Sequence, residues 1–265
     1  MVLNEKYELL KSILSEMGSV LVAYSAGVDS TFLLRTAHDV LDSSCVAVTA
    51  ASPLSPESEL RSAASFCAES GIEHILYAFD PFTVEHFSEN PPDRCYYCKS
   101  ALFSRFVAIA GERGLACVAE GSNLDDTGDY RPGMRAVQEQ KIRSPLLEAG
   151  LRKSEIRELS KALGLQTWNK PSCACLASRF PYGDTITQEG LDRVGRAEEK
   201  LRTLGFTQLR VRVHGSLARI EVPTAEMKTA LYNAQEIETS LRALGFLYVT
   251  LDLGGFRSGS MNRAL

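Results

Sequence analysis

The sequence predicts an α/β protein in which a parallel sheet with covering helices is followed by a second, smaller α/β domain. In the first two thirds of the 265 residues, short apolar runs typical of strands alternate with stretches of helical periodicity. From about Asp184 the order changes to helix, two strands, helix and strand. We therefore place the first domain at residues 1–183 and the second at residues 184–265.

The elements of the first domain follow from the apolar runs and the residues that flank them. The predicted strands are 20–24, 45–50, 74–79 and 116–119, and the predicted helices are 32–41, 57–69, 102–110 and 153–163. Ser55 caps the second helix, Pro56 occupies its first turn, and Gly71 ends it. The segment that starts at Ser144 is predicted as the end of a last strand.

The second domain is predicted to contain two helices, 188–204 and 225–244, and three strands, 208–214, 217–222 and 247–253. In the first of these strands, period-two alternation puts Arg210, Arg212 and His214 on one face and the apolar residues on the other. A cationic face of this kind is either solvated, which is usual for edge strands, or anion-binding, since two arginines spaced by two suit a phosphate.

Composition favours a small-molecule acceptor over a membrane or a nucleic acid. The chain is 45% hydrophobic, which suffices for a packed core, but no apolar stretch approaches the roughly 18 to 20 residues of a membrane span. The segment 4–17 is charged and amphipathic, unlike a signal peptide, so we expect a cytoplasmic protein without a membrane partner. A net charge of −4 provides no general field for RNA or DNA, and we expect no nucleic-acid partner.

The strongest chemical signal is the segment from Tyr24 to Thr31, between an apolar run and a helical run. Small residues there let main-chain N–H groups close around phosphate oxygens, and the helix N-terminus adds its dipole. A Walker loop would have a lysine before its Ser/Thr, whereas this loop has Asp29, which suits a magnesium-bound pyrophosphate. We assign a nucleotide with its Mg²⁺ to Ser25, Ala26, Gly27, Val28, Asp29, Ser30 and Thr31, and the resemblance described next implies that this nucleotide is ATP.

These residues resemble the PP-loop of the ATP pyrophosphatase superfamily, usually Ser-Gly-Gly-x-Asp-Ser. The resemblance implies a Rossmann-like fold of the adenine nucleotide alpha hydrolase type and cleavage of ATP between its α and β phosphates. Ala26 replaces the first glycine of the pattern. If that position has a positive φ, the alanine is strained.

Polar segments also follow other predicted strands. In parallel sheets ligands bind outside the carboxyl ends of the strands, so the loops after them face one crevice with the loop at Ser25. Asp125 and Arg131 belong to a turn-rich stretch that aims them toward a nucleotide or a second substrate. The additional nucleotide-binding residues that we assign are Ala51, Ser52, Gly121, Asp125 and Arg131.

Four of the seven cysteines form two close pairs, Cys95 with Cys98 and Cys173 with Cys175. The first pair precedes a helical run, whose dipole favours thiolates. Three interpretations are open on spacing alone: a structural zinc site with four sulfurs, an iron–sulfur cluster with three cysteine ligands and one open iron, and a redox pair of the thioredoxin type. The other three cysteines lie in apolar patterns and are interpreted as core residues: Cys45, Cys67 and Cys117.

Together with the PP-loop, the segments RCYYCK, GSNLDDTGDYRPG, KPSCACLASRFPYG and LDLGGFRSGSMN resemble the LarE family over nearly the whole chain. LarE proteins are ATP-dependent sulfur transferases of nickel-pincer cofactor biosynthesis. The resemblance implies adenylation of a carboxylate of pyridinium-3,5-biscarboxylic acid mononucleotide, followed by placement of sulfur there. It also implies a homo-oligomer, from a dimer to a hexamer. The sequence does not identify the sulfur donor.

Some LarE members sacrifice the sulfur of one cysteine, whereas others have three cysteines that hold a 4Fe-4S cluster. The three-cysteine pattern is present in this chain, and the resemblance implies Cys95, Cys98 and Cys175 as cluster ligands; it gives no role to Cys173. It further implies Asp29, Cys175 and Arg179 as catalytic residues. The substrate-binding residues that it implies are Ser178, Arg179, Arg210 and Arg212.

Three alternatives share the loop. An amidotransferase-like synthetase, such as NAD synthetase, would not need the clustered thiols of this chain. A PP-loop tRNA thiolase with an iron–sulfur cluster would use the same ATP chemistry but should carry a basic RNA-binding module, which this acidic chain lacks. An ATP-binding zinc protein without catalysis would release no pyrophosphate with any acceptor.

Overall fold

The computed structural model describes residues 2–128, 132–171 and 173–257, and it divides the chain into two compact units. The first unit comprises residues 1–84 and 93–173, and the second comprises residues 85–92 and 174–265. The chain thus enters the second unit briefly, returns to the first, and leaves it again. The boundary that we predict from the sequence, after residue 183, stays a prediction; residues 174–183 cluster with the second unit.

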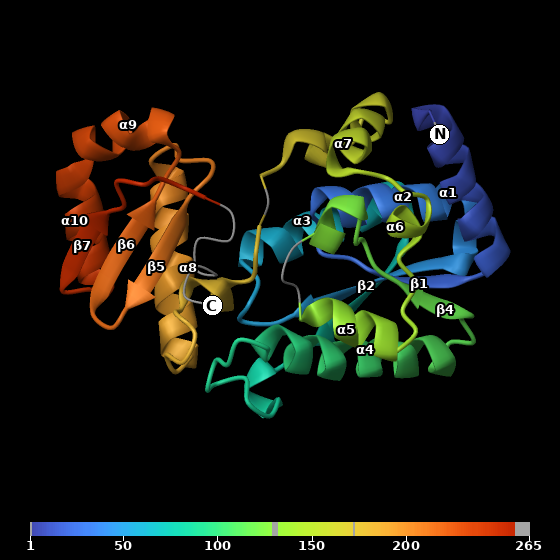
Figure 1. The fold of residues 1–265 in the computed structure, drawn as a ribbon, viewed down its shortest axis with the longest axis horizontal. Coiled ribbons are helices and arrows are strands. Elements are labelled where there is room, and N and C mark those ends of the chain that lie inside the picture. The colour runs from blue at the N-terminus through green and yellow to red at the C-terminus, as the bar shows by residue number, and fades with distance from the viewer. Residues whose placement is uncertain (1, 129–131, 172, 258–265) are drawn as a thin grey trace. The chain divides into compact units, whose positions relative to one another are not determined.

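The first unit contains a four-stranded sheet (Figure 1). Its strand order is β3-β2-β1-β4, and every pair is parallel. The strands are β1 (Val20–Ala23), β2 (Cys45–Ala51), β3 (Glu73–Ala78) and β4 (Cys117–Ala119). The order reverses direction at β1, which makes the carboxyl ends of β1 and β4 the place where a crevice is expected. The predicted parallel sheet is therefore confirmed.

Helices cover both faces of this sheet (Figure 1). The α-helices of the first unit are α1 (Leu3–Met17), α2 (Val28–Leu41), α3 (Glu57–Ser70), α4 (Arg94–Glu112), α5 (Gly133–Glu139), α6 (Pro145–Glu148) and α7 (Lys153–Ala162). The 3-10 helices are η1 (Asp42–Ser44), η2 (Pro81–Thr83), η3 (Leu124–Gly128) and η4 (Gln166–Asn169).

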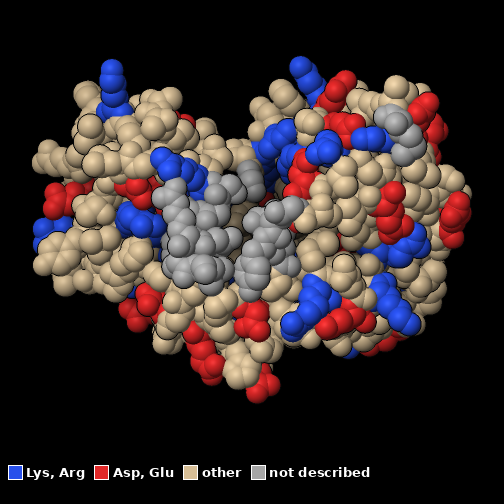
Figure 2. Space-filling model, viewed as in Figure 1, with Lys and Arg blue, Asp and Glu red and all other residues tan. Residues whose placement is uncertain are grey.

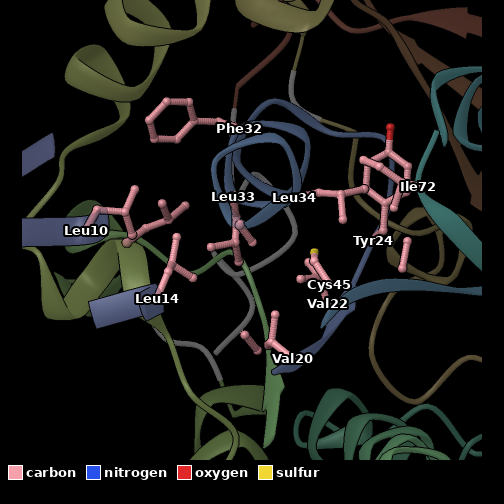
Figure 3. Close-up of a cluster of buried hydrophobic side chains, with 14 of the residues drawn as sticks. Leu10, Leu14, Val20, Val22, Tyr24, Phe32, Leu33, Leu34, Cys45 and Ile72 are labelled. Atoms are coloured by element: carbon pink, nitrogen blue, oxygen red, sulfur yellow. The ribbon is translucent and has the colours of Figure 1, made fainter. Parts of the chain in front are cut away.

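Alternation along β1 separates two hydrophobic cores. Val20 and Val22 point to one core, which also contains residues of α1, α2, α3, α6 and α7. Leu21 points to the other, which contains residues of α4 and α5. In Figure 3, Leu33 points from α2 into the first core, where it is completely buried. Both faces of the sheet are covered, as expected for parallel strands.

Three local predictions need correction. Pro56 itself, not Ser55, occupies the N-cap position of α3, and no side chain caps it, although Gly71 ends the helix in the left-handed conformation as expected. Helix α4 begins at Arg94, well before the predicted start at 102, because its first turns carry cysteine and tyrosine rather than an apolar repeat. The strand end predicted at Ser144 is an isolated bridge between Ala119 and Arg143, followed directly by α6.

The second unit is built on a three-stranded sheet in which β5 (Arg210–His214) pairs antiparallel with β6 (Leu217–Glu221), and β6 pairs parallel with β7 (Tyr248–Leu251). Its helices are η5 (Leu176–Arg179), α8 (Gln188–Thr203), η6 (Thr224–Glu226), α9 (Met227–Tyr232) and α10 (Ala234–Ala243). The predicted helix 225–244 is interrupted at Asn233, a residue with a low helix propensity.

The segment 85–92 is tied to the second unit through Asn90. This residue is completely buried and has a φ of +54°, which asparagine tolerates better than most residues. Its side-chain amide donates to the carbonyl of Pro181 at 2.6 Å, and its own carbonyl accepts the N–H of Gly183 at 2.9 Å. The N–H of Ile186 also donates to the carbonyl of Ser88.

Among the described residues, none of the helices combines the length and the apolar character that a membrane crossing requires. On the face shown in Figure 2, basic and acidic side chains are interspersed on each unit.

We predict that Leu33→Ala lowers the free energy of unfolding by about 2 to 5 kcal/mol, because it leaves a cavity in a fully packed core. Urea-induced unfolding measures this change. Leu76→Ala is the matched control, since Leu76 lies on the edge strand β3 and is 54% exposed; its loss should be at most about 1 kcal/mol. Equal losses in the two variants would contradict the assignment of the core.

Candidate functional site

The loop between β1 and α2 is held in a strained conformation. Ala26 has a φ of +54°, so the position that most PP-loops fill with glycine does require the left-handed region in this chain. The alanine is buried, and its carbonyl accepts a hydrogen bond from Nζ of Lys170 at 2.9 Å. The same Nζ lies 2.7 Å from a carboxylate oxygen of Glu59. These contacts hold the turn that leads into α2.

The N-terminus of α2 is suited to bind an anion. Its N-cap residue, Gly27, is extended, and no side chain caps the first turn. The first amides of a helix have no intrahelical acceptor, and the helix dipole adds positive potential there. The two hydroxyl groups that we expected to face phosphate lie within the loop's own network: Oγ of Ser30 accepts the N–H of Ser25 at 3.3 Å, and Oγ1 of Thr31 donates to the carbonyl of Gly27 at 2.7 Å.

Asp29 supplies a carboxylate oxygen that lacks a partner. Its Oδ2 forms an ion pair with Nζ of Lys153, whereas its buried Oδ1 has no hydrogen-bond partner among the described residues. Burial raises the pKa of Asp29, and the nearby Lys153 opposes that rise. A hard carboxylate oxygen without a partner, next to a helix N-terminus, fits the preference of Mg²⁺ for oxygen ligands.

The loop after β4 approaches α2 closely because Gly121 lacks a side chain. A Cβ at this position would lie 3.0 Å from the backbone nitrogen of Ser30 and 3.3 Å from Cβ of Asp29. Its neighbour Glu120 is buried and accepts hydrogen bonds from the Ser122 N–H, at 3.0 Å, and from the Ser144 hydroxyl, at 2.7 Å. Gly121 therefore lies at the predicted nucleotide loop, as expected from the strand order.

Asp125 stabilises the start of α7. One of its oxygens accepts the backbone N–H of Lys153 at 2.8 Å, and the other is 3.0 Å from a guanidinium nitrogen of Arg152. Asp125 thus fixes the start of α7, whose first residue, Lys153, forms the ion pair with Asp29. Ala51 ends β2, adjacent to β1, and Ser52 accepts the N–H of Leu54 at 3.3 Å. The last predicted nucleotide contact, Arg131, lies outside the described residues.

Two lysines to which the sequence analysis assigned no role, Lys153 and Lys170, contact the loop. One signal was available for Lys153. It is the first residue of α7 and follows Arg152, and cations are disfavoured at a helix N-terminus. A lysine in such a position indicates a role other than helix stability.

The cysteines fall into two groups. Cys95 and Cys98 lie in the first turns of α4 and are half-buried, and Nη2 of Arg94 is 3.7 Å from Sγ of Cys95. Cys173 and Cys175 are exposed; the former belongs to the first unit and the latter to the second. Within the described part of the chain, no group of three or more His, Cys, Asp or Glu side chains is arranged to hold a metal ion.

Of the remaining cysteines, Cys45 and Cys67 are core residues, as we expected, whereas Cys117 is only partly buried and packs against the core. Cys45 and Cys67 are each 1% exposed, and burial raises the pKa of the Cys67 thiol to about 11. Burial also raises the pKa of Cys117. Thiols in this state are poor nucleophiles at neutral pH.

The predicted substrate residues of the second unit lie around η5 and β5. Arg179 is completely buried and pairs with Glu198, and Arg212 pairs with Glu221 and donates to the carbonyl of Ser178 at 2.8 Å. The guanidinium of Arg210 lies over the ring of Phe256, 5.0 Å from its centroid. Both strand arginines are buried, so the interpretation of β5 as a solvated cationic face is wrong.

One characterised relative matches almost the whole chain. It is pyridinium-3,5-bisthiocarboxylic acid mononucleotide synthase of Lactiplantibacillus plantarum, which is 42% identical over 264 residues, covering 99% of this chain and 96% of the relative. The chain belongs to the LarE family. Two uncharacterized proteins are also similar to this LarE chain. One, from Synechocystis sp., is 44% identical over 99% of both chains, and the other, from Methanocaldococcus jannaschii, is 28% identical over 97% of this chain and 100% of its own. No family model matches the sequence.

We predict that Gly121→Ala weakens binding of a non-hydrolysable ATP analogue to this LarE protein by about tenfold, because the new methyl group would push the loop away from the first turn of α2. Calorimetric titration measures the affinity. Gly111→Ala, within α4 and with open space around its Cα, is the matched control and should bind as the parent does. An unchanged affinity in folded Gly121→Ala would contradict the assigned site.

Proposed function

We propose that this protein uses ATP to adenylate a carboxylate of pyridinium-3,5-biscarboxylic acid mononucleotide and then converts it to a thiocarboxylate, as a step of nickel-pincer nucleotide biosynthesis. The proposal of an adenylation step rests on Oδ1 of Asp29. This oxygen has no hydrogen-bond partner among the described residues, and it lies at a helix N-terminus that no side chain caps. The Lactiplantibacillus plantarum relative is a synthase of the bisthiocarboxylic acid mononucleotide, and we propose the same product for this protein. These comparisons do not favour the tRNA thiolase or the zinc protein.

In the first half of the reaction, the substrate carboxylate attacks the α phosphorus of ATP and pyrophosphate leaves. We assign the pyrophosphate to the first-turn amides of α2 and to Lys153, which together meet the negative charge that moves onto it. Asp29 is the residue that would hold Mg²⁺, and the bound ion would neutralise part of the same charge. No general base is needed, because the carboxylate is already an anion at neutral pH.

In the second half, a sulfur nucleophile attacks the activated carbonyl carbon and AMP leaves. Cys175 is the thiol that we propose for this step, because it is exposed and lies in the segment that matches the family's reacting cysteine. Its sulfur forms a thioester as AMP leaves; loss of the Cα proton and breakage of the Cβ–S bond then leave the thiocarboxylate on the substrate and dehydroalanine at position 175. The alternative that we propose is a 4Fe-4S cluster on Cys95, Cys98 and Cys175; in that form Cys175 is a ligand and the cluster would supply the sulfur in its place. The described residues do not by themselves assemble a metal site, and neither adenylation nor attack by the Cys175 thiol depends on a cluster.

The substrate's phosphate and second carboxylate need polar and cationic partners, and we propose Ser178, Arg210 and Arg212 for them. Arg179, which the resemblance also implies, is completely buried and paired with Glu198, so we propose that it supports this site without touching the substrate. Arg210 and Arg212 are buried, which strengthens their attraction for an anion relative to exposed arginines. Glu198 and Glu221 orient the neighbouring guanidinium groups, Arg179 and Arg212. A homo-oligomeric assembly and a cytoplasmic location belong to the same proposal.

We predict that Asp29→Asn lowers pyrophosphate release by at least about 100-fold, since an amide is a poor ligand for Mg²⁺ and leaves charge on the leaving group uncompensated. Release from ATP is measured with the biscarboxylate substrate present. Asp39→Asn is the matched control on the same helix, where Asp39 pairs with Arg35 at the surface, and it should keep the parent rate. Undiminished release by Asp29→Asn would refute the adenylation site.

We predict that protein purified without oxygen is brown and contains iron and acid-labile sulfide. Cys98→Ala should lose this iron, whereas Cys67→Ala, in the hydrophobic core, should retain it. Stoichiometric zinc without iron in the parent would reject the cluster and leave the adenylation proposal intact.

A further inference from the structure

The segment Ala174–Arg179, which we name the cysteine loop, is organised by the side chain of its own last residue. Nη1 of Arg179 lies 2.8 Å from the carbonyl oxygen of Ala174, 3.1 Å from that of Cys175 and 2.9 Å from Oγ of Ser178. The guanidinium is completely buried, whereas Cys175 is exposed. The exposed thiol of Cys175 is thus attached to a backbone segment that the buried guanidinium of Arg179 holds in place.

Glu198, on α8, fixes the direction of that cation. Its Oε1 lies 2.8 Å from Nε of Arg179, and its Oε2 lies 2.8 Å from Nη2, so the pair is bidentate. Oε1 also accepts the N–H of Val211 at 3.0 Å, and Oε2 lies 3.2 Å from Nη2 of Arg202. Burial alone would raise the pKa of Glu198, but its hydrogen bonds with Arg179 hold the pKa below the usual value. Glu198 is therefore a carboxylate that aims Nη1 of Arg179 at the loop.

The other contacts of the cysteine loop have the same effect. Arg212, held by Glu221, donates to the carbonyl of Ser178 at 2.8 Å. Helix α8 approaches the loop closely at a glycine, because a Cβ on Gly195 would lie 3.3 Å from Cδ1 of Leu176. Both ends of the loop are thus fixed by guanidinium groups whose own partners are completely buried carboxylates.

We propose that Glu198 is a positioning residue for sulfur transfer: through Arg179 it sets the backbone of Ala174 and Cys175 and thereby the direction of the Cys175 thiol. This inference rests on the proposed role of Cys175. A carboxylate that only filled space in the core would have no effect on the reactivity of an exposed thiol. The positioning role does have such an effect, because the two carbonyl groups that Arg179 holds belong to Cys175 and to the residue before it.

The test uses the full-length protein with Glu198→Gln. Glutamine keeps the shape of glutamate but replaces one acceptor with a donor, which faces a donor of Arg179. Three quantities are measured. The first is the rate at which iodoacetamide alkylates Cys175 in full-length protein freed of iron, with the modified residue located by peptide mass spectrometry. The other two are the rate of pyrophosphate release and the thiocarboxylate formed per pyrophosphate. We expect a severalfold change in alkylation and a fall of about 100-fold in thiocarboxylate per pyrophosphate, with pyrophosphate release near the parent rate.

Glu199→Gln is the matched control, since Glu199 is the next residue on α8 and is exposed. The ion pair described for Glu199 is a long one, 3.5 Å from Arg202. The Glu199→Gln variant should match the parent in all three quantities. Circular dichroism tests whether Glu198→Gln folds. If it does not, a second variant, Arg179→Lys, decides the outcome. Lysine keeps a cation opposite Glu198 but cannot reach the two loop carbonyls at the same time, so it should reproduce the loss.

Parent-like alkylation and parent-like thiocarboxylate yield in a folded Glu198→Gln or Arg179→Lys variant would overturn the positioning role. The experiment gives a different result if the proposed function, and not the positioning role, is wrong. If the parent protein releases no pyrophosphate with the biscarboxylate substrate, the function is wrong, yet the alkylation rates still report whether Glu198 controls the Cys175 thiol.

Discussion

The ion pair between Asp29 and Lys153 is the interaction on which the arrangement at the carboxyl ends of β1 and β4 depends. Asp29 belongs to the first turn of α2, and Lys153 is the first residue of α7, so the pair joins the two helix starts that flank the nucleotide loop. Asp125 accepts the backbone N–H of Lys153, and Gly121 lets the preceding loop lie against Ser30. One oxygen of Asp29 is thereby neutralised while the other keeps its capacity for a cation.

The second unit applies the same principle in its interior. A buried guanidinium is unfavourable without a partner, and in this unit Glu198 and Glu221 provide partners that are themselves completely buried. Because each guanidinium has five N–H donors, pairing with a carboxylate leaves others to hold backbone carbonyls. The carbonyls held in this way by Arg179 and Arg212 belong to the cysteine loop. Charge pairing and the anchoring of the backbone that carries the exposed Cys175 are therefore achieved by the same side chains.

The sequence predicted those features that local periodicity or a contiguous motif encodes. The strands of the first unit were predictable because Val20, Leu21 and Val22 are all apolar and flanked by polar turns, as buried parallel strands require. The turn between β1 and α2 was predictable because its residues are contiguous; its binding of phosphate stays a prediction. The pairing of Lys153 with Asp29 and of Glu198 with Arg179 was not, since each joins residues that are distant in sequence. Glu198 and Glu199 are adjacent and chemically identical, and only the packing of α8 buries one and exposes the other.

The discontinuity of the second unit has a consequence for synthesis of the chain. Residues 85–92 leave the ribosome long before Pro181, Gly183 and Ile186, which are their partners. The nascent polypeptide must therefore carry Asn90 without its native contacts until the later segment has been translated. A single proteolytic cut or gene truncation near residue 174 would also separate these partners, so the C-terminal unit cannot be excised intact at one position.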